Sequence, residues 1–138
     1  MQANIEAQKK FGAAVNSGDL ERLRDVVAPN AIDHDPAPGQ GHGPEGFIQF
    51  FTEFRSAFPD LELTVDHLTA DDDSVAIAYT VTGTHTGDFM GVPATGHRIT
   101  ARGVQIARFD ETGKTVERWG SSDELGILRQ IGAVPAMN

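Results

Sequence analysis

Residues 44–67 read PEGFIQFFTEFRSAFPDLELTVDH, and the spacing of their apolar residues changes at Pro59 from that of a helix to that of a strand. Before Pro59, phenylalanines recur at three- and four-residue steps, and Pro44 fits the first turn of a helix. After Pro59, Leu61 and Leu63 begin an alternation of apolar and polar residues that is typical of a half-buried strand. The stretch predicts a Phe-rich helix that packs in the core, with edges free to line a pocket.

The segments upstream of this stretch have helical patterns. Residues 5–15 form a helical stripe that stops at Asn16-Ser17-Gly18. Asp19 is a suitable cap for a second short helix over residues 20–27, which ends at Ala28-Pro29-Asn30. A loop rich in Gly and Pro is expected over residues 33–43.

The segments downstream have the period of strands. Alternating patterns predict strands over residues 75–85, 98–109 and 115–120, before a last short helix that begins near Ser122. Helices followed by mostly antiparallel strands predict an α+β fold, in which a curved sheet wraps around the N-terminal helices. We expect one domain over residues 1–138, with a pocket between the sheet and the Phe-rich helix.

Composition limits the classes of partner. The chain has 39% hydrophobic and 22% charged residues, which is ordinary globular usage, and no apolar run of membrane-spanning length. A net charge of −9 disfavours nucleic acid and anionic membranes, so a small neutral ligand fits best. With no cysteine and no signal-peptide pattern at the start, we expect a cytoplasmic protein without disulfides or a thiolate metal site.

Asp123 is the first candidate catalytic residue, because it lies where the last strand runs into the last helix. Strict alternation places Trp119, Ser121 and Asp123 on one side of that strand. If this is the concave side, Asp123 is a general acid/base in an apolar pocket, with Trp119 beside the substrate. The alternative is that Asp123 only stabilises the N-terminus of the helix.

Two histidines are further catalytic candidates. His34 lies between Asp33 and Asp35, which either hold its imidazole for acid–base chemistry or tie down a turn. His85 ends a strand and is expected either on the inner side or exposed at the strand end. The spacing of these residues and His42 does not favour a metal site, so we expect neither metal nor other cofactor.

Several residues are candidates for substrate binding. Gln105 alternates with Gly103 and Ala107, which indicates a polar wall with space in front of it. Phe89 and Met90 lie in a glycine-containing excursion, residues 86–96, which is either a lid over an apolar ligand or an oligomer contact. The inner face of the sheet and the edge of the Phe-rich helix add Tyr79, Phe51 and Phe54.

Seven short segments resemble the SnoaL-like polyketide cyclase family, whose fold is like that of nuclear transport factor 2. They occur in the family's order along nearly the whole chain: residues 33–36 (DHDP), 43–46 (GPEG), 58–61 (FPDL), 82–87 (TGTHTG), 91–97 (GVPATGH), 117–119 (ERW) with Asp123, and 130–132 (QIG). The resemblance implies a cone-shaped α+β barrel with a deep apolar pocket, assembled as a dimer or tetramer.

The resemblance also implies an activity. Family members close a ring of a polyketide ester by intramolecular aldol condensation without a cofactor, and their acid/base aspartate matches Asp123. They place a histidine two residues after the glutamine that matches Gln105, whereas this chain has Ala107 there. His85 or His34 is then expected to take that histidine's role.

Other functions remain open. Related folds hydroxylate or hydrolyse substrates with an Asp–Arg pair, and an isomerase or a non-catalytic ligand-binding domain also fits the pattern. For Arg118, strict alternation predicts the face opposite to Asp123. Val104 and Ile106 lie on the second face of their strand with no helix left to cover them, which predicts a homo-oligomer.

Overall fold

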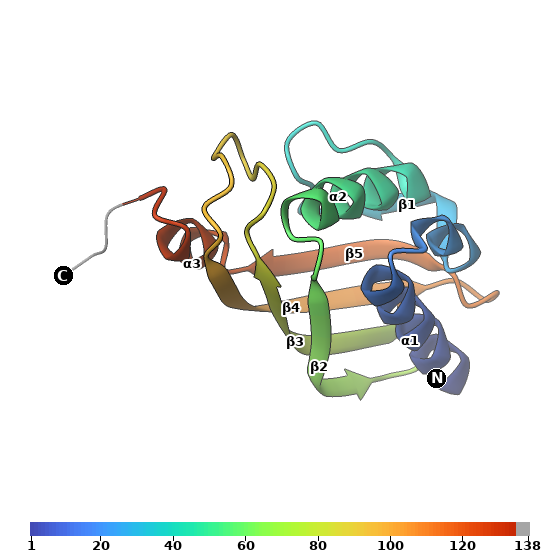
Figure 1. The fold of residues 1–138 in the computed structure, drawn as a ribbon. Coiled ribbons are helices and arrows are strands. Elements are labelled where there is room, and N and C mark those ends of the chain that lie inside the picture. Colours follow the sequence, from blue (N-terminus) through green and yellow to red (C-terminus); the bar gives the residue numbers. More distant parts are fainter. Residues whose placement is uncertain (135–138) are drawn as a thin grey trace.

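A curved sheet carries the longer helices on one of its faces in the computed structural model, which describes residues 1–134 (Figure 1). The chain runs α1 (Gln2–Ser17), the 3-10 helix η1 (Leu20–Asp25), β1 (Val27–Asp33), α2 (Gly43–Ala57), β2 (Glu62–Ala70), β3 (Ser74–Thr84), β4 (Arg98–Phe109), β5 (Thr115–Ser122) and α3 (Glu124–Gln130). None of the helices in this range is long and apolar enough to span a membrane.

The five strands form one mixed sheet in the order β1-β5-β4-β3-β2. All neighbouring pairs are antiparallel except β1 and β5, which are parallel. The α+β fold with a curved, mostly antiparallel sheet is therefore confirmed. The sheet stays open between the edge strands β1 and β2, and it does not close into the expected barrel.

The segment after α1 differs from the sequence prediction. Instead of one helix over residues 20–27, a 3-10 helix ends at Asp25 and β1 begins at Val27. Pro29 suggested a helix end and a loop, but a proline is tolerated in an edge strand, where its missing N–H leaves no ladder bond unmade. The Gly- and Pro-rich loop itself lies where it was predicted, between the end of β1 at Asp33 and the start of α2 at Gly43.

The Phe-rich helix α2 divides its aromatic side chains between core and cavity. Phe47 is buried and Phe58, just after the helix, is fully buried, whereas Phe50, Phe51 and Phe54 are half-buried. Phe11 of α1 meets Phe47 and Phe51 edge-on, with ring centroids 5.9 and 5.8 Å apart. This packing fixes α2 above the concave face of the sheet.

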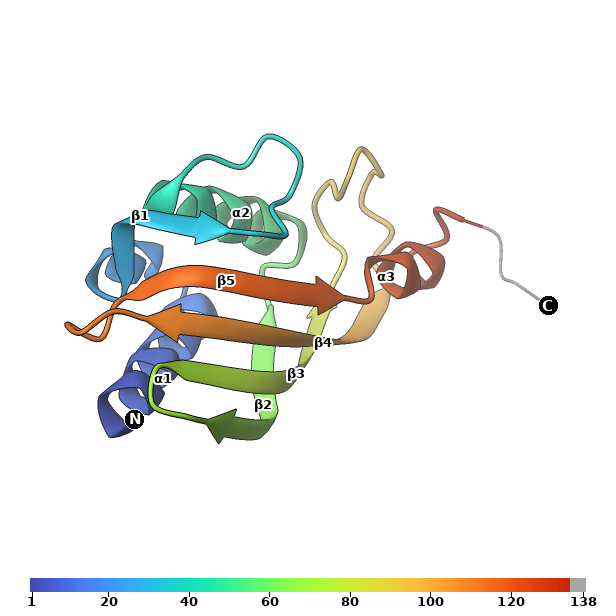
Figure 2. The same cartoon turned by 180° about the vertical axis from the view of Figure 1, so that it is seen from behind.

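The opposite, convex face of the sheet has no helix over it (Figure 2). Four apolar side chains are exposed there or at its edge, with exposed fractions of 55% for Ile32, 56% for Val104, 46% for Ile106 and 37% for Trp119. These four residues are called the convex apolar patch below.

Candidate functional site

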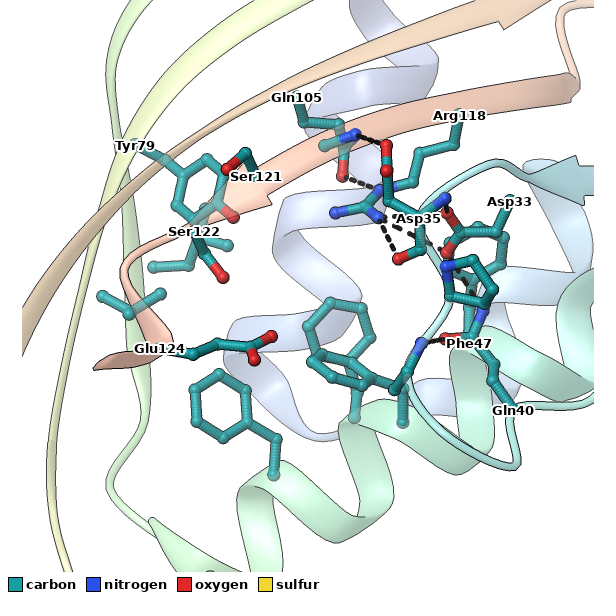
Figure 3. Close-up of a pocket in the computed structure, with 18 of the residues that line it drawn as sticks. Asp33, Asp35, Gln40, Phe47, Tyr79, Gln105, Arg118, Ser121, Ser122 and Glu124 are labelled. Atoms are coloured by element: carbon teal, nitrogen blue, oxygen red, sulfur yellow. Dashed lines mark hydrogen bonds and ion pairs between the residues drawn. The ribbon is translucent and has the colours of Figure 1, made fainter. Parts of the chain in front are cut away.

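A cavity of about 360 Å³ lies between α2 and the concave face of the sheet (Figure 3). Its aromatic wall consists of phenylalanines from α1 and α2: Phe11, Phe47, Phe50, Phe51 and Phe54. Its polar side chains come from the strands, from the loop after β1, from the start of α3 and, with Gln8, from α1. One aromatic wall facing a small set of polar groups is the usual form of a small-molecule site.

Two glycines make room for the polar side chains of the sheet. Tyr79 is the cross-strand partner of Gly103, and a Cβ on that glycine would overlap the Tyr79 ring. Likewise, a Cβ on Gly120 would overlap the guanidinium of Arg118. The sheet thus presents Tyr79, Gln105 and Arg118 to the cavity from three adjacent strands, β3, β4 and β5.

A buried ion pair closes one end of the cavity. Arg118 Nη1 donates to Asp33 Oδ1 at 3.1 Å, and the side chains are only 18% and 7% exposed. Arg118 Nε donates to Gln105 Oε1 at 3.1 Å. The Asp33 carboxylate also accepts from Gln40 Nε2 at 3.0 Å and from the Asp35 N–H at 2.9 Å. Asp33 is therefore held by donors on several sides.

The loop after β1 is tied to β5 by the same network. The Gly120 N–H donates to Asp35 Oδ2 at 2.8 Å, and Arg118 Nη1 lies 3.4 Å from the Asp35 carbonyl oxygen. This anchoring places Pro36, Ala37 and Pro38 against the cavity.

A carboxylate and a phenol lie at the other end. Glu124, the first residue of α3, points its carboxylate into the cavity, near Ser122 and Tyr79 (Figure 3). Burial raises the pKa of the Tyr79 phenol, although the charge of Arg118 acts in the opposite direction. The phenol therefore stays protonated at neutral pH and can donate a hydrogen bond.

Four of the predicted site residues line the cavity: Gln105, Tyr79, Phe51 and Phe54. Asp123 does not line it. The Asp123 side chain is exposed and caps α3, accepting a hydrogen bond from the Gly126 N–H at 2.8 Å. The alternative in which this carboxylate stabilises the helix N-terminus is the one that this geometry supports.

His34 and Trp119 lie together on the convex side, away from the cavity. Their rings stack with centroids 4.8 Å apart and planes 15° apart. His34 Nε2 donates to Glu117 Oε2 at 2.8 Å. This bond, followed by that from Arg108, lowers the pKa of Glu117. The structure therefore does not bring His34 or Trp119 to the substrate side.

His85 is fully buried and lies outside the cavity lining. The Thr95 N–H donates to His85 Nδ1 at 3.2 Å, and Thr95 Oγ1 lies 2.9 Å from the same atom. His85 thus holds the 86–96 excursion to the end of β3. Neither it nor His34 takes the place of a histidine beside Gln105.

The two apolar residues of that excursion are placed differently from each other. The Phe89 ring packs on Phe58 and Phe54, with centroids 5.3 and 5.9 Å apart. Met90 is 61% exposed. Neither lines the cavity, although Phe89 contacts Phe54, which does.

A β-bulge decides which face of β5 is the concave one, a choice that alternation alone left open. Phe109 pairs with Thr115, but Arg108 pairs with Glu117, so Val116 is an extra residue in the strand. One extra residue turns every following side chain to the other face. Arg118 and Gly120 therefore face inward, and Trp119 faces outward.

Strand alternation does not identify the four charged residues that line the cavity: Asp33, Asp35, Arg118 and Glu124. The register of β5 could have revealed Arg118. Once the bulge is allowed for, Gln105 pairs with Gly120, and Arg118, two residues before Gly120, lies on the same face as Gln105. Asp33 lies beside Arg118 in the parallel pair of β1 and β5, a pairing that no local pattern predicts.

Comparisons with known proteins agree with the fold. A family model described as SnoaL-like polyketide cyclase matches residues 5–131. The chain is 26% identical to aklanonic acid methyl ester cyclase DnrD of Streptomyces peucetius, over 96% of this chain and 92% of that protein.

Two solved structures are also similar to this chain. IdmH, a putative polyketide cyclase from Streptomyces antibioticus, has a TM-score of 0.81 and 34% identity, with 94% of this chain and 98% of that one covered. AclR, a putative hydroxylase from Streptomyces galilaeus, has a TM-score of 0.85 and 30% identity, with 100% and 86% covered.

Proposed function

The chain belongs to the SnoaL-like polyketide cyclase family, and from this premise we propose that it closes a ring of a polyketide ester by intramolecular aldol condensation, without a cofactor. The observation that carries the proposal is a carboxylate, Glu124, that points into a cavity with an aromatic wall. Phenylalanine rings suit a planar, conjugated substrate, since aromatic pairs gain energy beyond the area they bury.

The proposed reaction needs one group that first accepts and then returns a proton. A carboxylate takes the proton from the carbon α to the ester carbonyl, and the electron pair of that C–H bond forms an enolate. The α-carbon then bonds to a ketone carbon of the same substrate, whose carbonyl π electrons move to oxygen as an alkoxide. The carboxylic acid returns its proton to the alkoxide, so atoms and charge balance.

We place the acid/base carboxylate at the junction of β5 and α3, where two candidates are adjacent. Glu124 lies in the cavity, and no hydrogen bond to its carboxylate holds it among the described residues. Asp123, the residue that the resemblance implies, accepts the capping bond from Gly126 instead. The geometry favours Glu124, and the two residues are separable by substitution.

The test compares Glu124→Gln with Asp123→Asn, each of which keeps the shape and removes the basic oxygen. Glu124→Gln is expected to lose about 10²–10⁴-fold in kcat on polyketide esters with an unchanged melting temperature. Asp123→Asn is expected to keep its activity, and to lose less than about 1 kcal/mol of stability because Asn caps helices as well as Asp. Loss of activity only in Asp123→Asn would assign the role to Asp123, and full activity in both would overturn this catalytic site.

A second candidate function, from the hydroxylase and hydrolase alternatives, is epoxide hydrolysis. It is favoured by the inward Arg118–Asp33 pair and by the likeness to AclR, which is described as a putative hydroxylase. Incubation with an aromatic epoxide in ¹⁸O-labelled water separates the two reactions. Label in the product supports hydrolysis, whereas an aldol product formed from a polyketide ester carries no label.

We also propose that a second copy of the chain covers the convex apolar patch, giving a homodimer or a homotetramer. Val104 and Ile106 lie on the central strand β4, and Trp119 lies on the neighbouring strand β5. An apolar sheet face of this kind, next to the paired charges of Arg108 and Glu117, has the form of an isologous contact.

We propose that this assembly works in the cytoplasm. The 138-residue sequence contains no cysteine, so its stability uses no disulfide and requires no oxidising compartment. Cell fractionation with an antibody to the protein tests this location.

A further inference from the structure

The guanidinium of Arg118 has one arm without a protein partner. Nε donates to Gln105 and Nη1 donates to Asp33 and to the Asp35 carbonyl oxygen. Within residues 1–134, the hydrogen bonds of Arg118 use Nε and Nη1 and none uses Nη2. Among these residues, Arg118 is also the one cationic side chain that lines the cavity.

The amide of Gln105 is oriented by the same arginine. Because a guanidinium only donates, the Gln105 atom that faces Arg118 Nε must be the oxygen, Oε1. Its NH₂ group is then directed elsewhere, and no protein acceptor in the described part of the chain holds it. The polar end of the cavity therefore offers two unused donor groups, Gln105 Nε2 and Arg118 Nη2.

We infer that these two groups form an oxyanion site, which binds the negatively charged oxygen that develops on the substrate. This inference rests on the proposed aldol reaction, in which the enolate oxygen of the ester carries the charge before the new alkoxide is protonated by the carboxylic acid. Donors that are held in place before the reaction stabilise such a charge without reorganisation. Arg118 and Gln105 are catalytic residues in this assignment, since they touch the reacting oxygen.

Asp33 is a positioning residue for Arg118. It is almost fully buried and accepts from Arg118, Gln40 and the Asp35 N–H. The Asp33 carboxylate fixes one edge of the planar guanidinium and leaves the other edge free. A lysine at position 118 has the positive charge but lacks the planar guanidinium with its several N–H donors. It therefore cannot contact Gln105, Asp33 and the substrate together.

Gly120 is the second requirement of this geometry. It is the cross-strand partner of Gln105, and the Arg118 guanidinium lies where its Cβ would be. Since the overlapping atoms are the far end of a flexible side chain, Gly120→Ala displaces the guanidinium while leaving the ion pair's residues in place. This variant tests the position of Arg118 without removing a buried charge.

The first experiment measures binding and needs no turnover. The probe is 1,2-dihydroxyanthraquinone, a planar phenol whose visible spectrum reports its ionisation. Bound to the wild-type protein, its apparent pKa is expected to fall by about one unit, a tenfold preference for the phenolate. Arg118→Lys, Asp33→Asn and Gly120→Ala are expected to lose most of this shift.

The second experiment measures kinetics on a polyketide ester. Arg118→Lys and Gly120→Ala are expected to lower kcat about 10²–10³-fold, with a smaller effect on KM, because the interaction strengthens as charge develops. Arg108→Lys is the matched control. Arg108 donates to Glu117 at 2.8 Å, so it is also an Arg–carboxylate pair, but it does not line the cavity.

The outcomes separate this inference from the proposed reaction. A wild-type protein that shifts the probe but turns over no ester retains the oxyanion site and contradicts the reaction. A wild-type protein that does not bind or does not shift the probe overturns the inference. The inference is also overturned if Arg118→Lys and Gly120→Ala shift the apparent pKa of the bound probe as much as the wild-type protein does.

Discussion

Asp60, which lies outside the cavity, shows how hydrogen bonds to one carboxylate hold two segments of the chain together. Its two oxygens accept from the N–H and the hydroxyl of Thr84, both at 2.7 Å, at the end of β3. These bonds lower the pKa of Asp60, with the backbone N–H as the largest cause. Asp60 therefore ties the segment after α2 to the sheet through its ionised form.

The sign of this effect predicts a pH dependence. A carboxyl whose pKa is lower in the folded state stabilises the protein above its unfolded pKa, and this stability is lost as pH falls through the folded pKa. We expect Asp60→Asn to destabilise the protein near pH 7 and to differ less from wild type below about pH 4. Urea titrations at several pH values measure this.

The control for this prediction is Asp88→Asn. Asp88 is exposed and no hydrogen bond to its carboxylate is found in residues 1–134. Its effect on the free energy of unfolding should be small at every pH. An Asp60→Asn deficit that grows as pH falls would contradict the role assigned to the Thr84 bonds.

At the scale of elements, the apolar side chains of α2 and of Phe58, the residue after it, serve two purposes: some pack in the core and others line the cavity. Phe58 is fully buried, with its ring 5.4 Å from Phe54 and 5.5 Å from His85. Gly83 of β3 lies so close that its own Cβ would press on Phe58. Phe51, by contrast, is half-buried and lines the cavity.

This division predicts different outcomes for two equal truncations. Phe58→Ala is expected to cost about 3–5 kcal/mol of stability, because it leaves a cavity in a packed site. Phe51→Ala should cost less and should weaken binding of a planar aromatic ligand. Chemical denaturation and calorimetric titration measure the two effects, and equal stability losses with unchanged binding would contradict the division.

The sequence alone predicted those elements whose apolar period is long and uninterrupted. The Phe-rich helix begins and ends near its prolines, and β4 covers the predicted residues 98–109. The prediction failed where a local pattern carries no information about pairing. Pro29 favoured a helix end and a loop where the structure has the edge strand β1. The extra residue Val116 determines that Arg118, and not Trp119, lies on the inner face of β5.

The same distinction holds for the site. Gln105, Tyr79, Phe51 and Phe54 follow from alternation or helical spacing, and all four line the cavity. Arg118 and Asp33 meet only because β1 and β5 pair in parallel, although the two residues are 85 positions apart in sequence. Such a contact depends on the topology of the sheet, which local spacing does not encode.

At the scale of the whole molecule, the two faces of the sheet differ in what covers them. The concave face packs on α1 and α2, whereas no helix within residues 1–134 covers the convex face (Figure 2). The convex apolar patch includes Val104 and Ile106 near the middle of the sheet. Exposed apolar surface of this kind favours association.

We expect light scattering at micromolar concentration to give two or four times the chain mass of 14.8 kDa. Ile106→Glu places a charge in the convex apolar patch and should shift the mass toward that of one chain. Thr112→Glu, in the exposed turn between β4 and β5, is the control and should leave the mass unchanged. A monomeric wild type would contradict the proposed assembly.

The extra residue at Val116 acts on β5 as a one-letter insertion acts on a reading frame. Upstream of it, Thr115 is buried with Phe109; downstream, the frame is shifted and Arg118 replaces Trp119 on the inner side. A family that gains or loses one residue in this hairpin can exchange a solvent-facing set of side chains for a substrate-facing set without altering the fold. Alignments of such chains therefore compare functional positions correctly only when the bulge is given its own column.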